Sequence, residues 1–315
     1  MFEKVSPSHP DKLADRISGA IVDLCYTKSE WPKVAAEVLL GHGQCSLQIE
    51  TSERLTAEEL EAIVHRIAGE EVEVRALIVP QDVHLADNQA GAVRCGDNGI
   101  FRGCAPTSEQ KVLTAIAHSI YERYPYDGKY IINDKHGCLW PTCADGFANP
   151  IIDVTICQSH LPTADEEKFK EEILDPIYRQ SINLTHKEIK RIHYQTNINP
   201  IGPWTGGTDV DCGATNRKLG SDLGDGVTGG GLCGKDLSKA DVSVNIVCYL
   251  LAVEHGQTVT ACCSIGDEQV TFHYADGHEE TLPFADIVER ARLYIHCLGG
   301  FEKFSEWGLI RHKDY

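Results

Sequence analysis

The sequence predicts an α+β protein built from three units of mixed helices and strands, at residues 1–95, 96–198 and 199–315. Strand and helix patterns occur along the whole chain, without the strict strand–helix–strand alternation of a doubly wound parallel sheet. This order favours mostly antiparallel sheets that helices cover on one face. With 315 residues, the chain is long enough for two or three compact units with a sizeable core.

The N-terminal unit begins with an amphipathic helix, because Leu13, Ile17 and Ile21 recur at helical spacing. Thr56 and Glu59 have the spacing of a capping box, which marks the start of a second helix. The elements expected in this unit are a helix over 11–25 with Asp11 at its start as a possible N-cap, a hairpin over 34–50, a helix from Thr56 to about Ala68, a strand over 73–79 and a loop over 80–103.

The other two units are predicted from the same two periodicities. The central unit is expected to contain a helix over 109–124, strands over 129–134 and 150–159, and an acidic surface helix over 164–180. The C-terminal unit is expected to contain a long glycine-rich stretch to Gly234, an apolar helix over 240–255, paired strands over 258–266 and 269–275, and two short helical pieces at its end.

The composition bounds the class of function. The chain is 42% hydrophobic and 24% charged, which is typical of a soluble globular protein. No apolar run approaches the roughly 20 residues that span a membrane, and the N-terminus lacks a signal-peptide pattern, so we expect a cytoplasmic protein with no membrane partner. A net charge of -18 argues against a nucleic-acid partner, although an anionic ligand still fits a locally basic pocket.

The 13 cysteines predict neither disulfides nor a zinc site. Their number is odd, and no pair has the C-x-x-C spacing of a metal or redox motif. We interpret them as free thiols that pack as small apolar side chains.

The stretch GGGLCGKDLSK, residues 229–239, is the first candidate for chemistry. Gly229, Gly234 and Lys235 match G-x-x-x-x-G-K, but Asp236 stands where a P-loop needs Ser or Thr for its magnesium ion. The preceding residues are not a hydrophobic strand, which also argues against a P-loop. Two interpretations of this stretch remain: a glycine loop that approaches a polyphosphate, and a flexible surface loop with solvated lysines.

Four other polar stretches have ordinary explanations when each is taken alone, as a helix cap, a turn or solvated charges. They are SHPDK at 8–12, RCGDNG at 94–99, Lys135 after the strand ending in IND, and VDCGATNRK at 210–218. Their order in one chain resembles the S-adenosylmethionine synthetase family, whose motifs are GHPDK, GAGDQG, GDCGLTGRK and HGGGAFSGKDPSKVDRS. The last of these is similar to TGGGLCGKDLSKADVS here, and the resemblance covers nearly the whole chain.

The resemblance implies three similar units around a pseudo-threefold axis, and a homodimer or tetramer with active sites at the subunit interface. It implies that the methionine sulfur attacks C5′ of ATP, and that the displaced triphosphate is cleaved to pyrophosphate and phosphate. The catalytic residues that it assigns are His9, Lys135, Arg217, Lys218, Lys235 and Lys239. The ATP-binding residues that it assigns are Glu3, His9, Trp204, Asp211, Arg217, Lys218 and Lys235.

The resemblance also implies two magnesium ions, held through Asp11 and Asp241, and a potassium ion held through Glu37. The methionine-binding residues that it assigns are Glu50, Gln81, Asp97, Asp211 and Lys239. Cations are suited to this reaction because the leaving group is a polyanion, whereas a thioether has no proton for a base to remove.

The chain departs from the family pattern at several positions. The stretch between Gln81 and Asp97 is shorter, as is that from 222 to 228, and the substitutions are Pro7-Ser8 for Glu-Gly, His84 for Asp, Asn133 for Asp, Asn216 for Gly and Leu237 for Pro. Two other functions therefore remain open. One is an ATP or tripolyphosphate hydrolase without efficient methionine transfer, and the other is a non-catalytic nucleotide-binding homologue.

Overall fold

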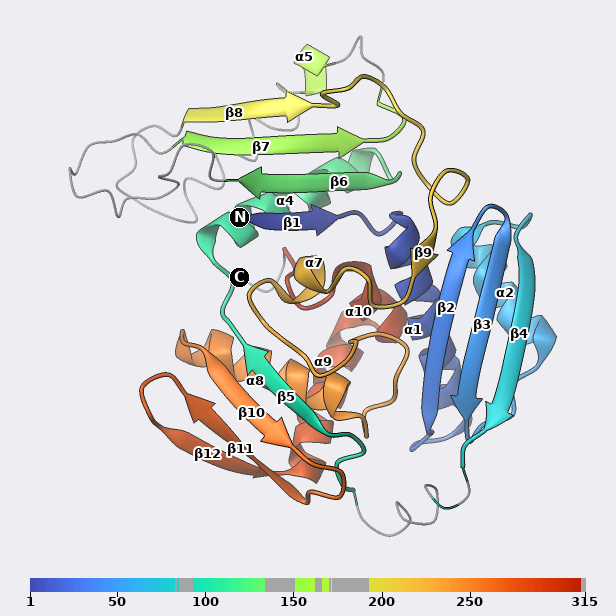
Figure 1. Ribbon diagram of the computed structural model, residues 1–315, viewed down its shortest axis with the longest axis vertical. Helices are drawn as coiled ribbons and strands as arrows, with labels where there is room; N and C mark the ends of the chain where they lie inside the picture. Colours follow the sequence, from blue (N-terminus) through green and yellow to red (C-terminus); the bar gives the residue numbers. More distant parts are fainter. Residues whose placement is uncertain are drawn as a thin grey trace. The chain divides into compact units, whose positions relative to one another are not determined.

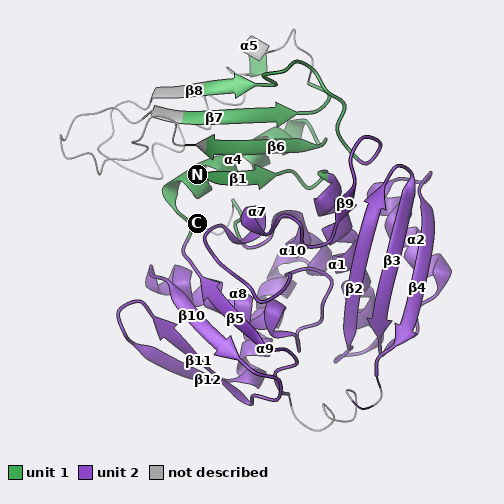
Figure 2. Cartoon of the chain, viewed as in Figure 1, with its two compact units in different colours: residues 1–9, 106–207, 310–315 green, residues 10–105, 208–309 purple. Residues whose placement is uncertain are grey.

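A computed structural model describes residues 1–82, 84, 93–133, 151–161, 166–169, 171 and 193–312 (Figure 1). The described strands form three sheets of four strands each. The chain divides into two compact units (Figure 2): unit 1 comprises residues 1–9, 106–207 and 310–315, and unit 2 comprises residues 10–105 and 208–309. No helix in the described ranges is long and apolar enough to cross a membrane.

Unit 1 contains one sheet, in the order β1-β6-β7-β8, with helix α4 packed against it. Its strands are β1 (Phe2–Val5), β6 (Gly128–Asn133), β7 (Ile151–Gln158) and β8 (His193–Ile198), and its helices are α4 (Ser108–Arg123) and α5 (Glu166–Phe169). Strands β7 and β8 pair in parallel, whereas β1, β6 and β7 are antiparallel. A capping box between Thr107 and Gln110 starts α4.

The first sheet of unit 2 has the order β4-β3-β2-β9, and helices α1 and α2 cover one of its faces (Figure 1). The elements are α1 (Pro10–Lys28), β2 (Val34–Gly41), β3 (Gln44–Thr51), α2 (Ala57–Ala68), β4 (Glu73–Pro80) and β9 (Gly213–Ala214). Buried and exposed side chains alternate strictly along β3, as expected for a sheet with one face on the core. The predicted hairpin and the capping box at Thr56 are confirmed.

The second sheet of unit 2 has the order β12-β11-β10-β5, and every pairing within it is antiparallel. Helices α8 and α9 pack against it. The elements are β5 (Gly99–Gly103), α8 (Ala240–His255), β10 (Val259–Cys263), β11 (Gln269–Tyr274), β12 (Glu279–Pro283) and α9 (Phe284–Leu298). The short helices α7 (Leu219–Leu223) and α10 (Phe301–Trp307) complete the unit.

The predicted α+β class with helix-covered, mostly antiparallel sheets is confirmed. Each of the three predicted sequence ranges supplies three successive strands to one sheet and a fourth strand to another sheet. Strand β1 joins β6–β8, β5 joins β10–β12, and β9 joins β2–β4. The boundaries near residues 95 and 198 stay a prediction.

Several local predictions were wrong or incomplete. The expected loop over 80–103 contains β5, and strands β8, β9 and β12 were not predicted. Strand β5 is short and lies between glycines, and β9 has only two residues, so neither contains a run long enough to show alternation. Helix α9 has 15 residues and is not a short piece. Of the helix expected over 164–180, the described residues show Glu166–Phe169 as α-helix, and most of the remainder lies outside them.

Candidate active site

Both sheets of unit 2 hold the glycine-rich stretch, residues 227–239, in place. At one end, Val227 and Arg102 exchange backbone hydrogen bonds of 3.0 Å, which ties the stretch to β5. At the other end, Lys235 lies opposite Ala35 of β2 in an antiparallel bridge. The backbone N–H of Ala36 donates to the Gly234 carbonyl at 2.7 Å. The stretch is therefore an ordered connection between two sheet edges, and the flexible-loop interpretation is wrong.

Asp236 anchors this connection. Its side chain is 1% exposed, and its carboxylate accepts backbone hydrogen bonds of 2.9 Å from Val34 and from Ser238. Lys235 lies in an extended bridge, and the next helix begins only at Ala240. This geometry rules out a P-loop, in which the lysine starts a helix and the following hydroxyl binds magnesium.

Three cationic side chains of unit 2 pair with three carboxylates. The distances from nitrogen to oxygen are 2.6 Å for Lys235 and Asp241, 3.5 Å for Lys239 and Asp97, and 3.5 Å for Arg217 and Asp11. Burial raises the pKa of Asp97, while Lys239 lowers it and the nearby Asp241 raises it further. Four sequence stretches therefore meet in pairs of opposite charge: the segment 235–241 with Asp97, and Arg217 with Asp11.

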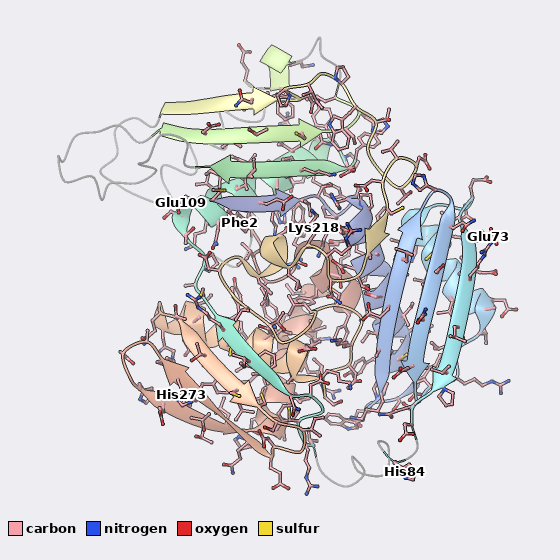
Figure 3. All side chains as sticks on the ribbon, in the orientation of Figure 1. Phe2, Glu73, His84, Glu109, Lys218 and His273 are labelled. Atoms are coloured by element: carbon pink, nitrogen blue, oxygen red, sulfur yellow. The ribbon has the colours of Figure 1, made fainter. Side chains whose placement is uncertain are left out.

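The stretch 211–218 joins this site through β9. Asp11 lies inside the first turn of α1, which begins at Pro10, so the expectation that Asp11 is an N-cap was wrong. Its carboxylate accepts a hydrogen bond of 3.0 Å from the backbone of Ala214. The Thr215 hydroxyl donates to Glu37. Lys218 (Figure 3) is the N-cap residue of α7, and the Asp211 carboxylate accepts from the Cys212 backbone at 2.9 Å.

The carboxylates suit magnesium, which proteins usually bind through one or two carboxylates while phosphates and waters complete the octahedron. No group of three or more His, Cys, Asp or Glu side chains arranged for a metal occurs in the described ranges. A Cβ atom at Gly230 would overlap Asp241 Oδ2 and crowd the Lys235 ammonium, so glycine leaves room for this ion pair. Glu37 alone supplies one carboxylate, which does not define a potassium site, and potassium stays a prediction.

Three of the five residues predicted to bind methionine lie at one end of the β2–β4 sheet or on the segment before β5, whereas Asp211 precedes β9 and Lys239 precedes α8. Glu50 is exposed near the end of β3, opposite Val79. Gln81 follows β4, and its side-chain oxygen is buried with no hydrogen-bond partner in the described structure. Asp97 Oδ2 is likewise buried with no hydrogen-bond partner in the described structure. Two buried acceptors that lack donors are notable, because nearly all such groups are satisfied in folded proteins. His84 is exposed (Figure 3).

Unit 1 contains three of the other predicted residues. Glu3 is exposed on β1, and His9 is 2% exposed, with its backbone N–H donating to Ser6 at 3.0 Å. The indole of Trp204 donates to Asn199 at 3.2 Å. Lys135 lies outside the described residues. The assigned roles of these four residues stay predictions.

Sequence reasoning missed a buried charge cluster beneath the site. The Lys12 ammonium is 2.9 Å from Asp15 and 2.8 Å from Asp222, and all three side chains are at most 1% exposed. Burial raises the pKa of Asp15 to about 6, although Lys12 opposes the shift. Burial also acts to lower the pKa of Lys12, but the two carboxylates raise it above its ordinary value. The spacing of Lys12 and Asp15 on one helix face was the available signal.

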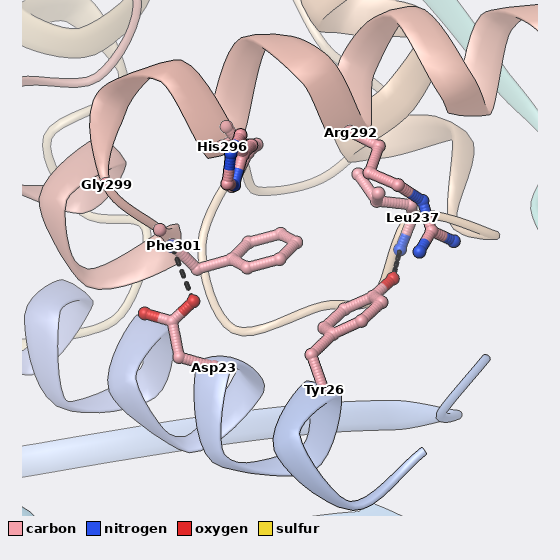
Figure 4. A pocket seen from close by; sticks show the side chains of 9 residues that line it. Asp23, Tyr26, Leu237, Arg292, His296, Gly299 and Phe301 are labelled. Atoms are coloured by element: carbon pink, nitrogen blue, oxygen red, sulfur yellow. Dashed lines mark hydrogen bonds between the residues drawn. The ribbon is translucent and has the colours of Figure 1, made fainter. Parts of the chain in front are cut away.

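A cavity of about 380 Å³ lies on another side of the glycine-rich stretch, between α1 and α9 (Figure 4). Tyr26 and Phe301 stack there with ring centroids 5.3 Å apart, and Arg292 and His296 contribute to the lining. The Tyr26 hydroxyl accepts the backbone N–H of Leu237 at 3.2 Å, so this wall is continuous with the segment between Lys235 and Lys239.

Comparison with known proteins gives one consistent result. Residues 1–74 match the family model for the N-terminal domain of S-adenosylmethionine synthetase. An S-adenosylmethionine synthase from Mycoplasma mycoides is 30% identical over 284 residues, which cover 79% of this chain and 71% of that protein. Another, from Novosphingobium aromaticivorans, is 28% identical over 344 residues, covering 95% and 85%.

A solved structure described as an unusual S-adenosylmethionine synthetase from Campylobacter jejuni is similar in fold. It superimposes with a TM-score of 0.69 at 18% identity, covering 100% of this chain and 95% of that one.

Proposed function

Because the chain belongs to the S-adenosylmethionine synthetase family, we propose that it makes S-adenosylmethionine from ATP and L-methionine. The observation that carries the proposal is the set of three cation–carboxylate pairs beside the glycine-rich stretch. Cationic side chains stabilise a bound polyphosphate, and carboxylates bind the metal ions that accompany it. Both kinds of group are held here inside a chain whose net charge is -18.

The proposed reaction needs positioning and charge stabilisation. A lone pair of the methionine sulfur forms the bond to C5′ of ATP, and the C5′–O bond breaks. The triphosphate leaves with the electron pair of that bond, and the sulfur becomes a sulfonium ion. No proton moves in this step, so its barrier depends on in-line alignment and on cations near the leaving oxygens. Water then cleaves the triphosphate to pyrophosphate and phosphate.

The cations of unit 2 are assigned to the triphosphate. Lys235 is half-buried and fixed by the bridge to β2, so its ammonium is pre-positioned for a phosphate oxygen. Lys239 lies at the start of α8, where it pairs with Asp97. Arg217 and Lys218 are assigned to the far end of the chain of phosphates, and His9 to the phosphate near the breaking bond. Lys135 is assigned, with Lys235, to the flanks of the chain.

Asp11 and Asp241 are the residues that would hold two magnesium ions. When bound, these ions would neutralise charge on the phosphate oxygens. Asp241 already lies against Lys235, so one carboxylate can orient both the lysine and a metal-bound phosphate. Glu50, Gln81, Asp97 and Asp211 are assigned to methionine and the nucleotide, and Glu3 and Trp204 to ATP.

We also propose a homodimer, formed through the uncovered face of the β2–β4 sheet. Leu39, Leu77 and Val79 lie on that face and are 56%, 58% and 36% exposed. Glu37 and Glu50 share the face, which supports an active site completed by a second copy of the chain. Large apolar side chains that stay exposed on an uncovered sheet face are typical of an interaction surface.

The test is an incubation of the purified protein with ATP, methionine, Mg²⁺ and K⁺, followed by mass spectrometry for the sulfonium product and an assay for phosphate and pyrophosphate. A sample without methionine is the control. Sulfonium product matched by phosphate and pyrophosphate supports the synthetase. Phosphate without sulfonium product favours the hydrolase, and ATP binding without either product favours the non-catalytic homologue.

One substitution links this activity to the site. Lys235→Ala should lower the rate of sulfonium formation by on the order of 10²–10³, the usual effect of removing one preorganised electrostatic contact. Lys303→Ala is the matched control, because this lysine is exposed on α10 and pairs with Glu306 of the same helix. Equal rates for the two variants would contradict the assignment of Lys235.

A further inference from the structure

The two cation-bearing stretches of unit 2 are joined by one side chain, Asn216. Its amide Nδ2 donates to the Cys233 carbonyl at 3.2 Å, and its Oδ1 accepts the Cys233 N–H at 2.9 Å. The asparagine thus pairs with the Cys233 backbone through one donor and one acceptor, as a neighbouring strand would. Cys233 is 2% exposed, so both of its backbone groups depend on protein partners.

The backbone of Asn216 is held from the opposite side. Its N–H donates to Asp15 at 2.7 Å, and Asp15 is fixed by the buried ion pair with Lys12. Asn216 has a φ of 61°, in the left-handed region where asparagine is one of the few side chains that are tolerated. Helix α1, stretch 211–218 and the glycine-rich stretch are therefore connected through a single residue.

The neighbourhood of Asn216 is shaped to accept this amide. A Cβ atom built at Gly231 would overlap the Asn216 side chain, whose atoms are the three nearest to it. A residue larger than glycine does not fit at position 231, because the Asn216 amide occupies the space that a Cβ atom would need. The Asn216 amide therefore has one close and specific set of contacts, unlike the amide of a surface asparagine, which can bond to several neighbouring groups.

Stretch 211–218 and the glycine-rich stretch also both form backbone hydrogen bonds with strand β2, at different points. Thr215 donates its N–H to the Val38 carbonyl at 3.1 Å, while Gly234 and Asp236 pair with residues 34–36. Arg217 follows Asn216 directly, and Lys235 is separated from Cys233 by one residue. A fixed distance between Asn216 and Cys233 therefore sets the spacing between the cations of the two stretches.

We propose that Asn216, which stands where the family pattern has glycine, is a positioning residue particular to this chain. It holds the Arg217–Lys218 pair and Lys235 at the separation at which they bind one polyphosphate chain. The inference rests on the proposed function, because it concerns the same site. Asn216 acts through the backbone of Cys233 and need not touch the substrate. Fixing the two cation-bearing stretches before binding avoids an ordering cost at the moment of binding.

The principal test is Asn216→Gly. Glycine accepts the left-handed backbone, so the substitution removes the side-chain amide without adding backbone strain. The matched control is His42→Gly, at an exposed hairpin residue whose φ is 51° and whose backbone N–H still reaches Thr208. Both variants add the same freedom to the unfolded chain, so their difference isolates the effect of the amide.

The first readout is the affinity for inorganic tripolyphosphate with Mg²⁺, measured by calorimetry. Asn216→Gly should weaken it by about 10- to 100-fold, the usual effect of removing a residue that orients binding groups. The second readout is the split between kinetic constants: kcat/KM for ATP should fall while KM for methionine stays unchanged. The third is hydrogen exchange at the Cys233 amide, which should become faster in Asn216→Gly and stay unchanged in His42→Gly.

A double-mutant cycle with Gly231→Ala tests the contact itself. Alone, Gly231→Ala should lower the melting temperature, because the new methyl group meets the amide. In the Asn216→Gly background it should lower it much less, since the space is then free. Additive effects in this cycle would overturn the geometry on which the proposal depends.

The outcomes separate the two proposals. A wild-type protein that binds tripolyphosphate but makes no sulfonium product contradicts the proposed function, while the affinity comparison still judges the role of Asn216. An active wild type whose Asn216→Gly variant keeps its tripolyphosphate affinity and its kcat/KM for ATP overturns the positioning role and leaves the synthetase standing.

Discussion

The two four-stranded sheets of unit 2 are alike in strand order but differ in their uncovered faces. On the β2–β4 sheet, the uncovered face carries three exposed apolar side chains, Leu39, Leu77 and Val79. On the β10–β12 sheet, the corresponding face carries one large apolar side chain, Ile100, which is 68% exposed, and polar side chains that contact one another across strands. His273 lies 3.0 Å from Glu279, and the hydroxyls of Thr271 and Thr281 are 2.9 Å apart (Figure 3 labels His273).

This difference indicates two kinds of surface. A face whose side chains pair with one another in water gains little from a partner, whereas a face of uncovered leucine and valine gains free energy when a second surface excludes water. The predicted ligands Glu37 and Glu50 lie on the same face as these three apolar side chains. The comparison therefore favours the β2–β4 sheet over the β10–β12 sheet for the proposed subunit contact.

Leu77→Glu should have the largest effect. A carboxylate at the centre of a proposed interface would be buried without a partner, so we expect a monomer and a loss of synthesis of at least about 10²-fold. The measurement is light scattering after size exclusion, together with the sulfonium assay. Thr281→Glu on the other sheet is the control and should change neither. A Leu77→Glu variant that stays dimeric and active would reverse the assignment of the two faces.

Gly103→Ala should be the most destabilising of the small substitutions. A methyl group there would overlap the Cys248 backbone of α8, and overpacking of this kind costs about 1–3 kcal/mol. The counterpart on the other sheet is Gly41, whose new Cβ would meet the Cys212 sulfur at 2.7 Å. Because that side chain can rotate away, Gly41→Ala should cost less. Urea unfolding of both variants tests the order.

Helix α1, which packs on the β2–β4 sheet, should make the stability of the protein depend on pH. Helix α1 buries Asp15, whose pKa burial raises to about 6 from an ordinary 3.8. A raised carboxyl pKa in the folded state means that stability from this group is complete below about pH 4 and is lost as pH rises through about 6. Asp15→Asn should remove this part of the decline in unfolding free energy.

The comparison for Asp15 is urea unfolding of wild type and Asp15→Asn at several pH values from 4 to 7. As pH rises, the unfolding free energy of the wild type should fall relative to that of Asp15→Asn. A difference that is constant across this range would show that Asp15 titrates alike in the folded and unfolded chains.

Glu279→Gln should have the smallest effect. It removes an exposed pair with His273 on the polar sheet face, where such contacts contribute about 0–1 kcal/mol. The melting temperature should change little, and salt should reduce even that change. A large loss would mean that this face is covered in solution, which would remove the contrast between the two sheets.

Elements with a strong local period were predictable. The hairpin of β2 and β3, the capping box at Thr56 and helix α8 follow from side-chain spacing within one segment. Strands β5 and β9 were not predictable, because they are short and become strands only by pairing with β10 and β2, which lie far away in the sequence. Pairing energy, rather than local propensity, makes these residues extended.

The same division applies to the site. The motifs identified Lys235, Lys239, Arg217 and the carboxylates as a set, since residue type and order are properties of the chain itself. They did not indicate which cation pairs with which carboxylate. Nor did they indicate that Asp236 anchors the glycine-rich stretch to Val34, because that contact spans 202 positions.

The sequence by itself therefore determined the α+β class, the family and the chemical character of the site, because these depend on residue types and short spacings. Only the tertiary structure decided that Asn216 joins two cation-bearing stretches, that Lys12, Asp15 and Asp222 form one buried cluster, and that Leu39, Leu77 and Val79 share one uncovered sheet face. Those features arise from contacts between residues that are distant in the chain, and such contacts are set by packing rather than by local pattern.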